Sequence, residues 1–161
     1  MKPVTESDIR AAFVNCTKGE AKRVGVPKDL DERPWDELDF LGWSDVSGAD
    51  RGYLVAESGD GLVGVALRVA PKTGQVRRSM CSLCLTTHTG DGVALMTARK
   101  AGTSGRQGDS VGIYICTDLA CSLYLRGRKD GGRRINETIT LEEKVERMHA
   151  NLTAFLRKVT G

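Results

Sequence analysis

The 161-residue sequence lacks the patterns on which most enzymes and membrane proteins depend. It has two histidines, no phosphate-binding loop, no Gly-x-Ser-x-Gly nucleophile motif and no His-Glu-x-x-His pair. No apolar run approaches the roughly 18 residues that a transmembrane helix needs, and there are no internal repeats. We therefore expect a monomeric protein that is not an enzyme and that has no contact with a membrane.

Residues 1–16 are polar and lack the apolar stretch of a secretory signal, so we expect a cytoplasmic, reducing location. In such a compartment, cysteines are more often metal ligands or catalytic groups than disulfides.

Four of the five cysteines form two close pairs, Cys81 with Cys84 and Cys116 with Cys121. Four thiolates suit one tetrahedral Zn²⁺ with bonds of about 2.3 Å, and a closed site of this kind is structural because no position is left for substrate. A disulfide framework or a redox Cys-x-x-Cys are the alternatives, although a redox site would leave the second pair without a role. The spacing favours one structural zinc ion.

The residues around the two pairs predict a knuckle, a hairpin and a helix in that order. The apolar run 111–115 reads as a buried strand, so we expect hairpin strands at 92–99 and 110–116, joined by a polar, glycine-rich loop at 101–109. A helix over 119–126, capped by Thr117 or Asp118, would place Cys121 in its first turn. This order is typical of a treble-clef zinc finger.

The other segments read as a scaffold of the α+β class. We expect a helix from Thr5 to about Cys16, a hairpin with strands 52–57 and 62–69, and an amphipathic helix over 141–159 with a Thr140–Glu143 capping box. The long helix should pack on the protein's own sheet, with a partner-binding helix as the alternative. Aromatic residues between 35 and 43 should close one edge of the core; a peptide groove is the other possibility. We divide the chain into an N-terminal α/β lobe (1–76) and a zinc-binding module with the C-terminal helix (77–161).

Three further residues could be mistaken for ligands. Cys16 lies on the first expected helix and reads as a small buried thiol, with a reactive thiol or an additional ligand as the alternatives. His88 follows the first knuckle and reads as a surface residue or as a neighbour of the metal ligands, because four cysteines already complete the tetrahedron. His149 should point to solvent from the long helix.

Positive charge is concentrated on the zinc module. Residues 77–134 contain ten Lys and Arg against four Asp and Glu, a net +6, whereas residues 1–76 carry a net −3 and residues 135–161 are neutral. Four thiolates on Zn²⁺ account for only about −2 of compensating charge. The excess predicts an acidic partner, either ribosomal RNA or an acidic protein surface, unless it is merely a solvated face. The ten cations are Arg77, Arg78, Arg99, Lys100, Arg106, Arg126, Arg128, Lys129, Arg133 and Arg134.

The sequence resembles the elongation factor G-binding family at residues 77–84, 96–102 and 112–127. The resemblance includes the cysteine spacing, with two residues between the members of the first pair and four between those of the second. That family includes the fusidic-acid-resistance proteins of staphylococci, and the Arg- and Gly-rich sequence here resembles its actinobacterial branch. The resemblance is strongest over 76–134. It implies that the four cysteines hold zinc and that the protein binds the translocase elongation factor G on or near the ribosome.

We expect the partner surface to use the basic face of the zinc module, through Arg99, Lys100, Arg126, Arg128 and Lys129. The alternative function is a zinc-stabilised RNA-binding module that uses the same face, which the net +6 charge and the scarcity of aromatic hot-spot residues favour.

Overall fold

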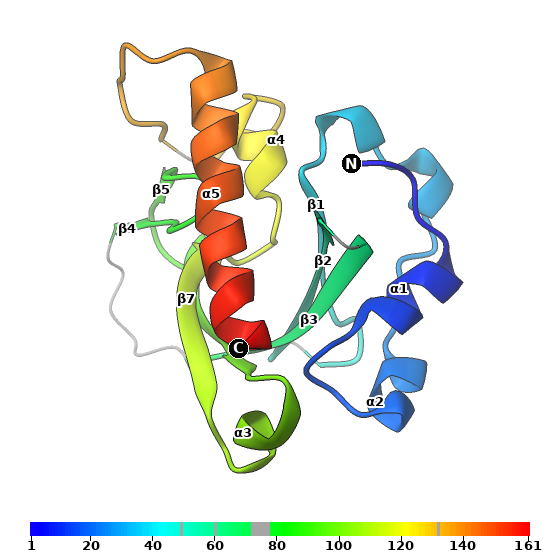
Figure 1. Cartoon of the computed structure of the whole chain (residues 1–161). Helices are drawn as coiled ribbons and strands as arrows, with labels where there is room; N and C mark the ends of the chain where they lie inside the picture. The colour runs from blue at the N-terminus through cyan, green and yellow to red at the C-terminus, as the bar shows by residue number, and fades with distance from the viewer. Residues whose placement is uncertain (49, 60, 72–77, 132) are drawn as a thin grey trace.

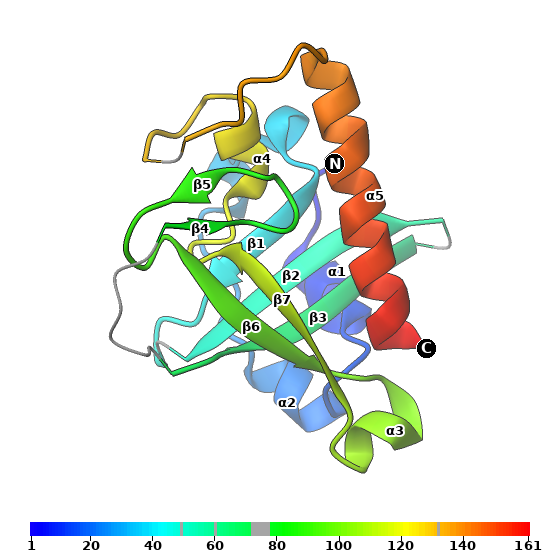
Figure 2. The same ribbon diagram turned by 90° about the vertical axis from the view of Figure 1, so that its left-hand side faces the viewer.

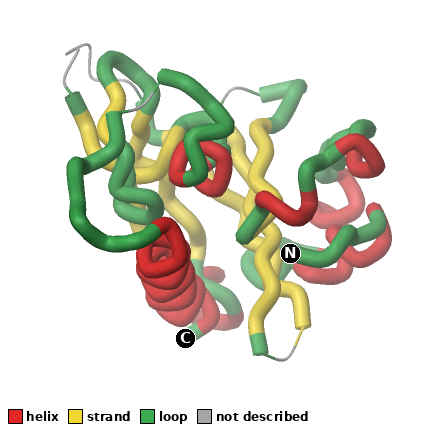
Figure 3. The backbone as a smooth tube through the Cα atoms, turned by 90° about the horizontal axis from the view of Figure 1, so that it is seen from above, coloured by secondary structure: helices red, strands yellow, loops and turns green. Residues whose placement is uncertain are grey.

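A five-stranded antiparallel sheet, with strand order β1-β2-β3-β6-β7, separates two groups of helices in the computed structural model of the chain (Figure 1). The structure describes all residues except 49, 60, 72–77 and 132. Helices α1 and α2 lie on one side of the strands and the long helix α5 lies on the other, as the view from above also shows (Figure 3). The strands of the sheet are β1 (Phe40–Ser44), β2 (Arg51–Ser58), β3 (Gly61–Val69), β6 (Val93–Arg99) and β7 (Ser110–Cys116).

The first helix, α1 (Glu6–Ala12), begins at the expected Thr5 cap, where Thr5 and Asp8 form a capping box. The expectation that it extends to Cys16 is wrong. The chain leaves the helix at Phe13, which forms a parallel bridge with Gly64, and the Val14 amide donates to the Gly64 carbonyl at 3.0 Å. A Cβ at Gly64 would lie 3.1 Å from the Phe13 backbone, so the glycine permits this close approach. A second helix that we did not expect, α2 (Lys18–Arg23), follows.

Strands β2 and β3 form the expected hairpin, with Leu54 opposite Val65. The segment before it contains two 3₁₀ turns, η1 (Leu30–Glu32) and η2 (Trp35–Glu37), and then β1, which pairs with β2. Strand β1 was not expected from the sequence. The expectation that the nearby aromatic residues belong to the core is confirmed, because Trp35, Phe40 and Trp43 are all buried.

Strands β6 and β7 confirm the second expected hairpin, with Val93 opposite Cys116 at one end and Arg99 opposite Ser110 at the other. The connecting segment is not entirely a loop, because residues Gly102–Arg106 form a short helix, α3. This helix sits at the end of the hairpin remote from α4 (Cys121–Leu125) and from the small sheet of β4 (Ser79–Met80) and β5 (Thr87–His88) (Figure 2).

Helix α5 (Leu141–Thr160) confirms the predicted long helix and its Thr140–Glu143 capping box. Its apolar stripe packs on the protein's own core through Met148, Leu152, Phe155, Leu156 and Val159. None of the helices that the structure describes is both long and apolar enough to cross a bilayer.

Two apolar clusters lie on the two sides of the sheet. The larger contains the four paired cysteines, Ile113, Ile115 and the α5 stripe, and the smaller contains Ile9, Trp35 and Tyr53. The sheet is continuous from β3 to β6 through the pairs Arg68–Thr97 and Val69–Met96. The lobe boundary expected between residues 76 and 77 lies outside the described residues.

Candidate metal centre

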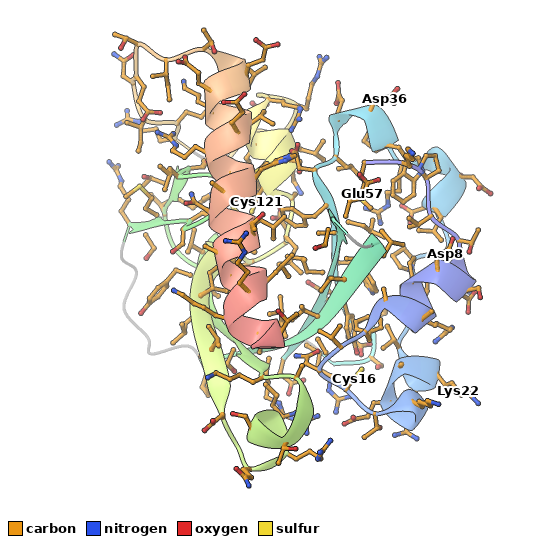
Figure 4. The ribbon with its side chains drawn as sticks, viewed as in Figure 1. Asp8, Cys16, Lys22, Asp36, Glu57 and Cys121 are labelled. Carbon is orange, nitrogen blue, oxygen red and sulfur yellow. The ribbon has the colours of Figure 1, made fainter. Side chains whose placement is uncertain are left out.

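The fold brings the sulfur atoms of Cys81, Cys84, Cys116 and Cys121 within 4.8 Å of one another. The Sγ atoms of Cys81 and Cys121 are 3.6 Å apart, as are those of Cys84 and Cys116. A tetrahedron with Zn–S bonds of about 2.3 Å has S···S edges of roughly 3.8 Å, so the four atoms fit one zinc ion. A disulfide needs about 2.05 Å, which excludes that alternative for both close contacts. All four side chains are buried, and Cys16 lies elsewhere, on the side that carries α1 and α2 (Figure 4).

The first knuckle is a tight turn between β4 and β5. The Leu85 amide donates to the Cys81 carbonyl and the Cys81 amide donates to the Thr86 carbonyl, each at 3.0 Å. The Leu83 amide points at the Cys81 sulfur, 3.4 Å away. Leu85 has a φ of 56°, the left-handed conformation that turns the chain back sharply. The turn therefore places two sulfurs on one side and supplies a backbone donor to one of them.

The second pair joins the end of β7 to the first turn of α4. Cys121 is the first residue of α4, which confirms that it lies in the first turn. The helix is shorter than expected, because Leu119 adopts a left-handed φ of 58° and the helix can begin only after it. Ala120 is then the N-cap residue, so neither Thr117 nor Asp118 occupies the expected cap position. The carboxylate of Asp118 instead accepts the Ala120 amide at 3.1 Å and the Tyr124 hydroxyl at 2.8 Å.

The left-handed Leu119 fits against the sheet because glycines face it. A Cβ at Gly42 in β1 would lie 2.5 Å from the Leu119 Cβ and 2.8 Å from its carbonyl oxygen, and a Cβ at Gly52 in β2 would lie 3.1 Å from a Leu119 methyl. Leu119 itself is 2% exposed. The turn that carries Cys121 is thus seated on strands from the N-terminal half of the chain.

His88 is a polar side chain that lies beside the sulfurs. Its Nε2 atom lies 3.5 Å from the Cys116 sulfur, and its ring meets Tyr124 edge-on with centroids 4.6 Å apart. The imidazole is buried, so the surface position expected for it is wrong and the position beside the ligands is the one observed. With Cys116 as a thiolate, an Nε2–H can donate to the sulfur and fix its orientation.

The charges of the four sulfurs depend on one another. Hydrogen bonds from the Cys116 and Cys121 thiols lower the pKa of Cys81, whereas burial and the neighbouring sulfurs raise the pKa of Cys121 well above its usual value. Four buried thiolates cannot coexist without a cation, because each added negative charge opposes the next. Zinc binding therefore expels protons and is coupled to the formation of the site.

The residues expected to contact a partner occupy two opposite ends of the zinc module. Arg99 and Lys100 lie at the α3 end of β6, six residues from Val93 and so about 20 Å along the strand from its metal end at about 3.3 Å per residue. Arg126, Arg128 and Lys129 follow α4 at the metal end. Arg77 lies outside the described residues.

Carboxylates of the same chain contact four of these five cations. Arg99 lies 3.1 Å from Glu20, Arg128 2.7 Å from Glu37 and Lys129 2.7 Å from Asp118, and the side chains of these three cations are exposed. Arg126 differs, because its side chain is 17% exposed and it forms a two-pronged pair with Asp39.

Asp39 is central to the contacts around Arg126, and nothing in the sequence predicted this role. Its side chain is 5% exposed, and it accepts from Arg126 Nη2 at 3.0 Å and faces His149 Nε2 at 2.7 Å, so His149 is paired although half-exposed. The Asp39 amide also donates to Ser122, next to Cys121, at 3.0 Å. Its residue type and the acidic stretch around it give no signal for these contacts, which join segments more than 80 residues apart.

Comparison with known proteins agrees with this geometry. No curated protein and no solved structure matches the chain significantly. The family profile described as the FBP C-terminal treble-clef zinc-finger, which corresponds to the elongation factor G-binding family that the cysteine spacing resembles, matches residues 8–159. The match covers both cysteine pairs, the sheet and nearly all of α5. The chain is therefore a zinc-binding member of the FBP C-terminal treble-clef zinc-finger family.

Proposed function

We propose that this protein binds translation elongation factor G, on or near the ribosome, and that its zinc ion stabilises the binding surface without taking part in catalysis. The observation that carries the proposal is the family match over residues 8–159, because the family's name points to this partner. The closed set of four buried cysteines supports the non-catalytic role, since it leaves no coordination position for water or substrate.

The surface at the metal end of the module is the best candidate for contact with the factor. Arg128 and Lys129 are 64% and 44% exposed there, whereas Arg126 holds Asp39 inside the protein. Met80 and Tyr114 are also exposed on the zinc module, and the two segments that carry them are joined by a hydrogen bond from the Ser82 amide to the Tyr114 carbonyl at 2.8 Å. Exposed tyrosine and arginine are the residue types that dominate binding energy at protein interfaces.

The test compares two charge-reversed proteins. Arg128→Glu with Lys129→Glu changes the metal end, and Arg99→Glu with Lys100→Glu is the matched pair at the α3 end. With purified elongation factor G at low salt, we expect the first pair to slow association by about tenfold with little change in zinc content, because exposed charges mainly steer encounter. Added salt should reduce the wild-type rate in the same way.

The competing candidate is an RNA-binding module, which the net charge of +6 over residues 77–134 favours. A pull-down from a cytosolic extract, with and without ribonuclease, separates the two. Retention of the factor after ribonuclease treatment supports direct protein binding. Tight binding of structured RNA, with no binding of the purified factor at low salt, would replace our proposal with the RNA module.

A further inference from the structure

A second site lies on the opposite side of the sheet from the metal centre. A cavity of about 640 Å³ opens beside α2, over the ends of β2, β3 and β6. Its walls include Arg23, Arg51, Arg68 and Arg99, with Asn15 and Cys16 beside them. Figure 4 shows Cys16 on the α1–α2 side, well separated from Cys121. The cavity belongs to no part of the metal centre, and most of its arginines lie outside the zinc module.

The strand register forces two of these arginines together. Arg51 of β2 is directly opposite Arg68 of β3, and Arg68 is in turn opposite Thr97 of β6. Like charges directly opposite each other on a sheet are destabilising. In the part of the chain that the structure describes, no carboxylate lies within ion-pair distance of Arg23, Arg51 or Arg68. Among the described residues, only the weaker attraction of Arg51 to Asp45 offsets this repulsion, so solvent or a bound anion is needed to relieve the rest.

Glu20 is the only acidic side chain among the described residues of the wall, and it neutralises little of this charge. Glu20 accepts the Thr17 amide at 2.7 Å as part of the α2 capping box, and its other oxygen lies 3.1 Å from Arg99. Four arginines against one glutamate leave three net positive charges around the cavity. Asp45 is a carboxyl outside the lining, and its pKa is lowered mainly by hydrogen bonds from Ser47 and only to a small extent by the charge of Arg51. Ser47 and Tyr53 already donate to its two oxygens.

The floor of the cavity is fixed before any ligand arrives. Asn15 is buried, and its amide nitrogen donates to the carbonyls of Ala66 and Arg99 at 2.9 and 3.0 Å, while its oxygen accepts the Ala66 amide at 2.8 Å. These bonds tie the segment after α1 to both β3 and β6. A rigid floor beneath several guanidinium groups is preorganised, which reduces the entropy that a ligand must lose on binding.

We propose that this cavity binds a phosphate-bearing small molecule. Guanidinium groups bind phosphate oxygens in a planar, bidentate manner, and several of them suit a group with two negative charges better than a single carboxylate. The volume is within the range of about 300–1,000 Å³ typical of small-molecule sites and exceeds what a bare phosphate would fill. The expected ligand is thus a phosphate ester or diphosphate whose organic part occupies the remaining space. This inference is independent of binding to elongation factor G.

Cys16 provides a reporter inside the cavity. It is the only cysteine outside the metal centre and is partly exposed. Burial first and Glu20 second raise the pKa of its thiol, so alkylation is slow but measurable at alkaline pH. On the zinc-loaded full chain, mass spectrometry should record a single iodoacetamide adduct, which Cys16→Ala removes. Saturating ADP or pyrophosphate should slow its formation at least tenfold, and inorganic phosphate should protect it more weakly.

The arginine variants test whether protection arises from this site. Arg51→Gln with Arg68→Gln should weaken ADP binding, measured by calorimetry, at least tenfold. Arg128→Gln with Arg133→Gln, which removes two exposed arginines of the zinc module, should leave it unchanged. Arg68→Lys keeps the charge but loses the bidentate geometry and should bind with intermediate affinity. Unaltered alkylation at millimolar concentrations of all three phosphates would overturn the proposal. So would binding of an RNA oligonucleotide, lost in the Arg51 and Arg68 variant, without binding of any small phosphate.

Discussion

At the level of single residues, the five cysteines divide according to their surroundings. Cys116 is fully buried, meets the Cys84 sulfur at 3.6 Å and lies beside His88, whereas Cys16 is partly exposed in the arginine-lined cavity. A thiolate of the first kind stabilises the fold through zinc. A thiol of the second kind contributes only its small packing volume.

We expect Cys116→Ala to lose zinc and unfold the zinc module. A structural zinc site contributes on the order of 10 kcal/mol, which is comparable to the whole stability of a typical domain at about 5–15 kcal/mol. Elemental analysis and circular dichroism measure the two effects. Cys16→Ala is the matched control and should keep one zinc per chain, with a loss of less than about 1 kcal/mol. Full zinc retention in Cys116→Ala would show that Cys116 is not a ligand.

At the level of elements, the hairpins and the long helix could be predicted because their signals are local. The β6–β7 hairpin and the cap of α5 follow from alternation, periodicity and the Thr140–Glu143 box. The metal ligands were predictable for the same reason, since each pair lies within six residues. The side of the sheet on which each apolar residue packs is a different matter: Leu123 of α4 packs against the smaller cluster, whereas Leu152 of α5 belongs to the larger one.

The remaining elements depend on contacts between distant segments. The first helix ends before Phe13 because the absence of a side chain at Gly64 lets the two backbones approach. Helix α4 begins only after Leu119, which packs in its left-handed conformation against glycines 42 and 52 of the sheet. No window of sequence around Phe13 or Leu119 contains its partner. The arginine-lined cavity could not be predicted either, because the register of the strands, and not closeness in the sequence, brings its arginines together.

Leu119 packs directly against Gly42 of β1, so a side chain at this glycine should be poorly tolerated. Gly42→Ala should destabilise the protein by about 2–3 kcal/mol, because the new methyl group would overlap both the side chain and the carbonyl oxygen of Leu119. Urea unfolding of the zinc-loaded protein measures the change. Gly25→Ala, whose new Cβ would meet only an Asp45 oxygen at 3.9 Å, should change stability by no more than about 0.5 kcal/mol. Equal effects of the two substitutions would mean that Leu119 moves freely off the strand.

At the level of the whole molecule, one buried carboxylate joins three parts of the chain. Asp39 precedes β1, Arg126 ends α4 and His149 lies on α5, and all three meet at the Asp39 carboxylate. The β1 segment, the turn after the metal ligands and the C-terminal helix are therefore joined through a single buried carboxylate. Removal of this charge should therefore destabilise contacts on both sides of the sheet.

Removing this charge should destabilise the protein in a way that depends on pH. Burial acts to raise the pKa of Asp39, but hydrogen bonds from Arg126 and His149 and the Arg126 charge outweigh it and hold the pKa below its usual value. A lowered pKa in the folded protein means that the carboxylate contributes full stability above its unfolded pKa of about 3.9 and loses it as the pH falls further. Asp39→Asn should therefore cost about 3 kcal/mol at pH 7, because it leaves Arg126 largely buried without its partner.

Urea unfolding of the zinc-loaded wild type and Asp39→Asn measures this difference. It should stay constant from pH 7 to pH 5 and narrow only below about pH 4, where the wild-type carboxylate takes up its proton. Asp36→Asn, at an exposed carboxylate three residues away, should differ from the wild type by less than about 0.5 kcal/mol throughout. A difference that already shrinks between pH 7 and pH 6 would contradict the assignment of this pH dependence to Asp39, whose lowered pKa confines it to more acidic solutions. A difference near zero at pH 7 would show that the three segments are held by packing alone.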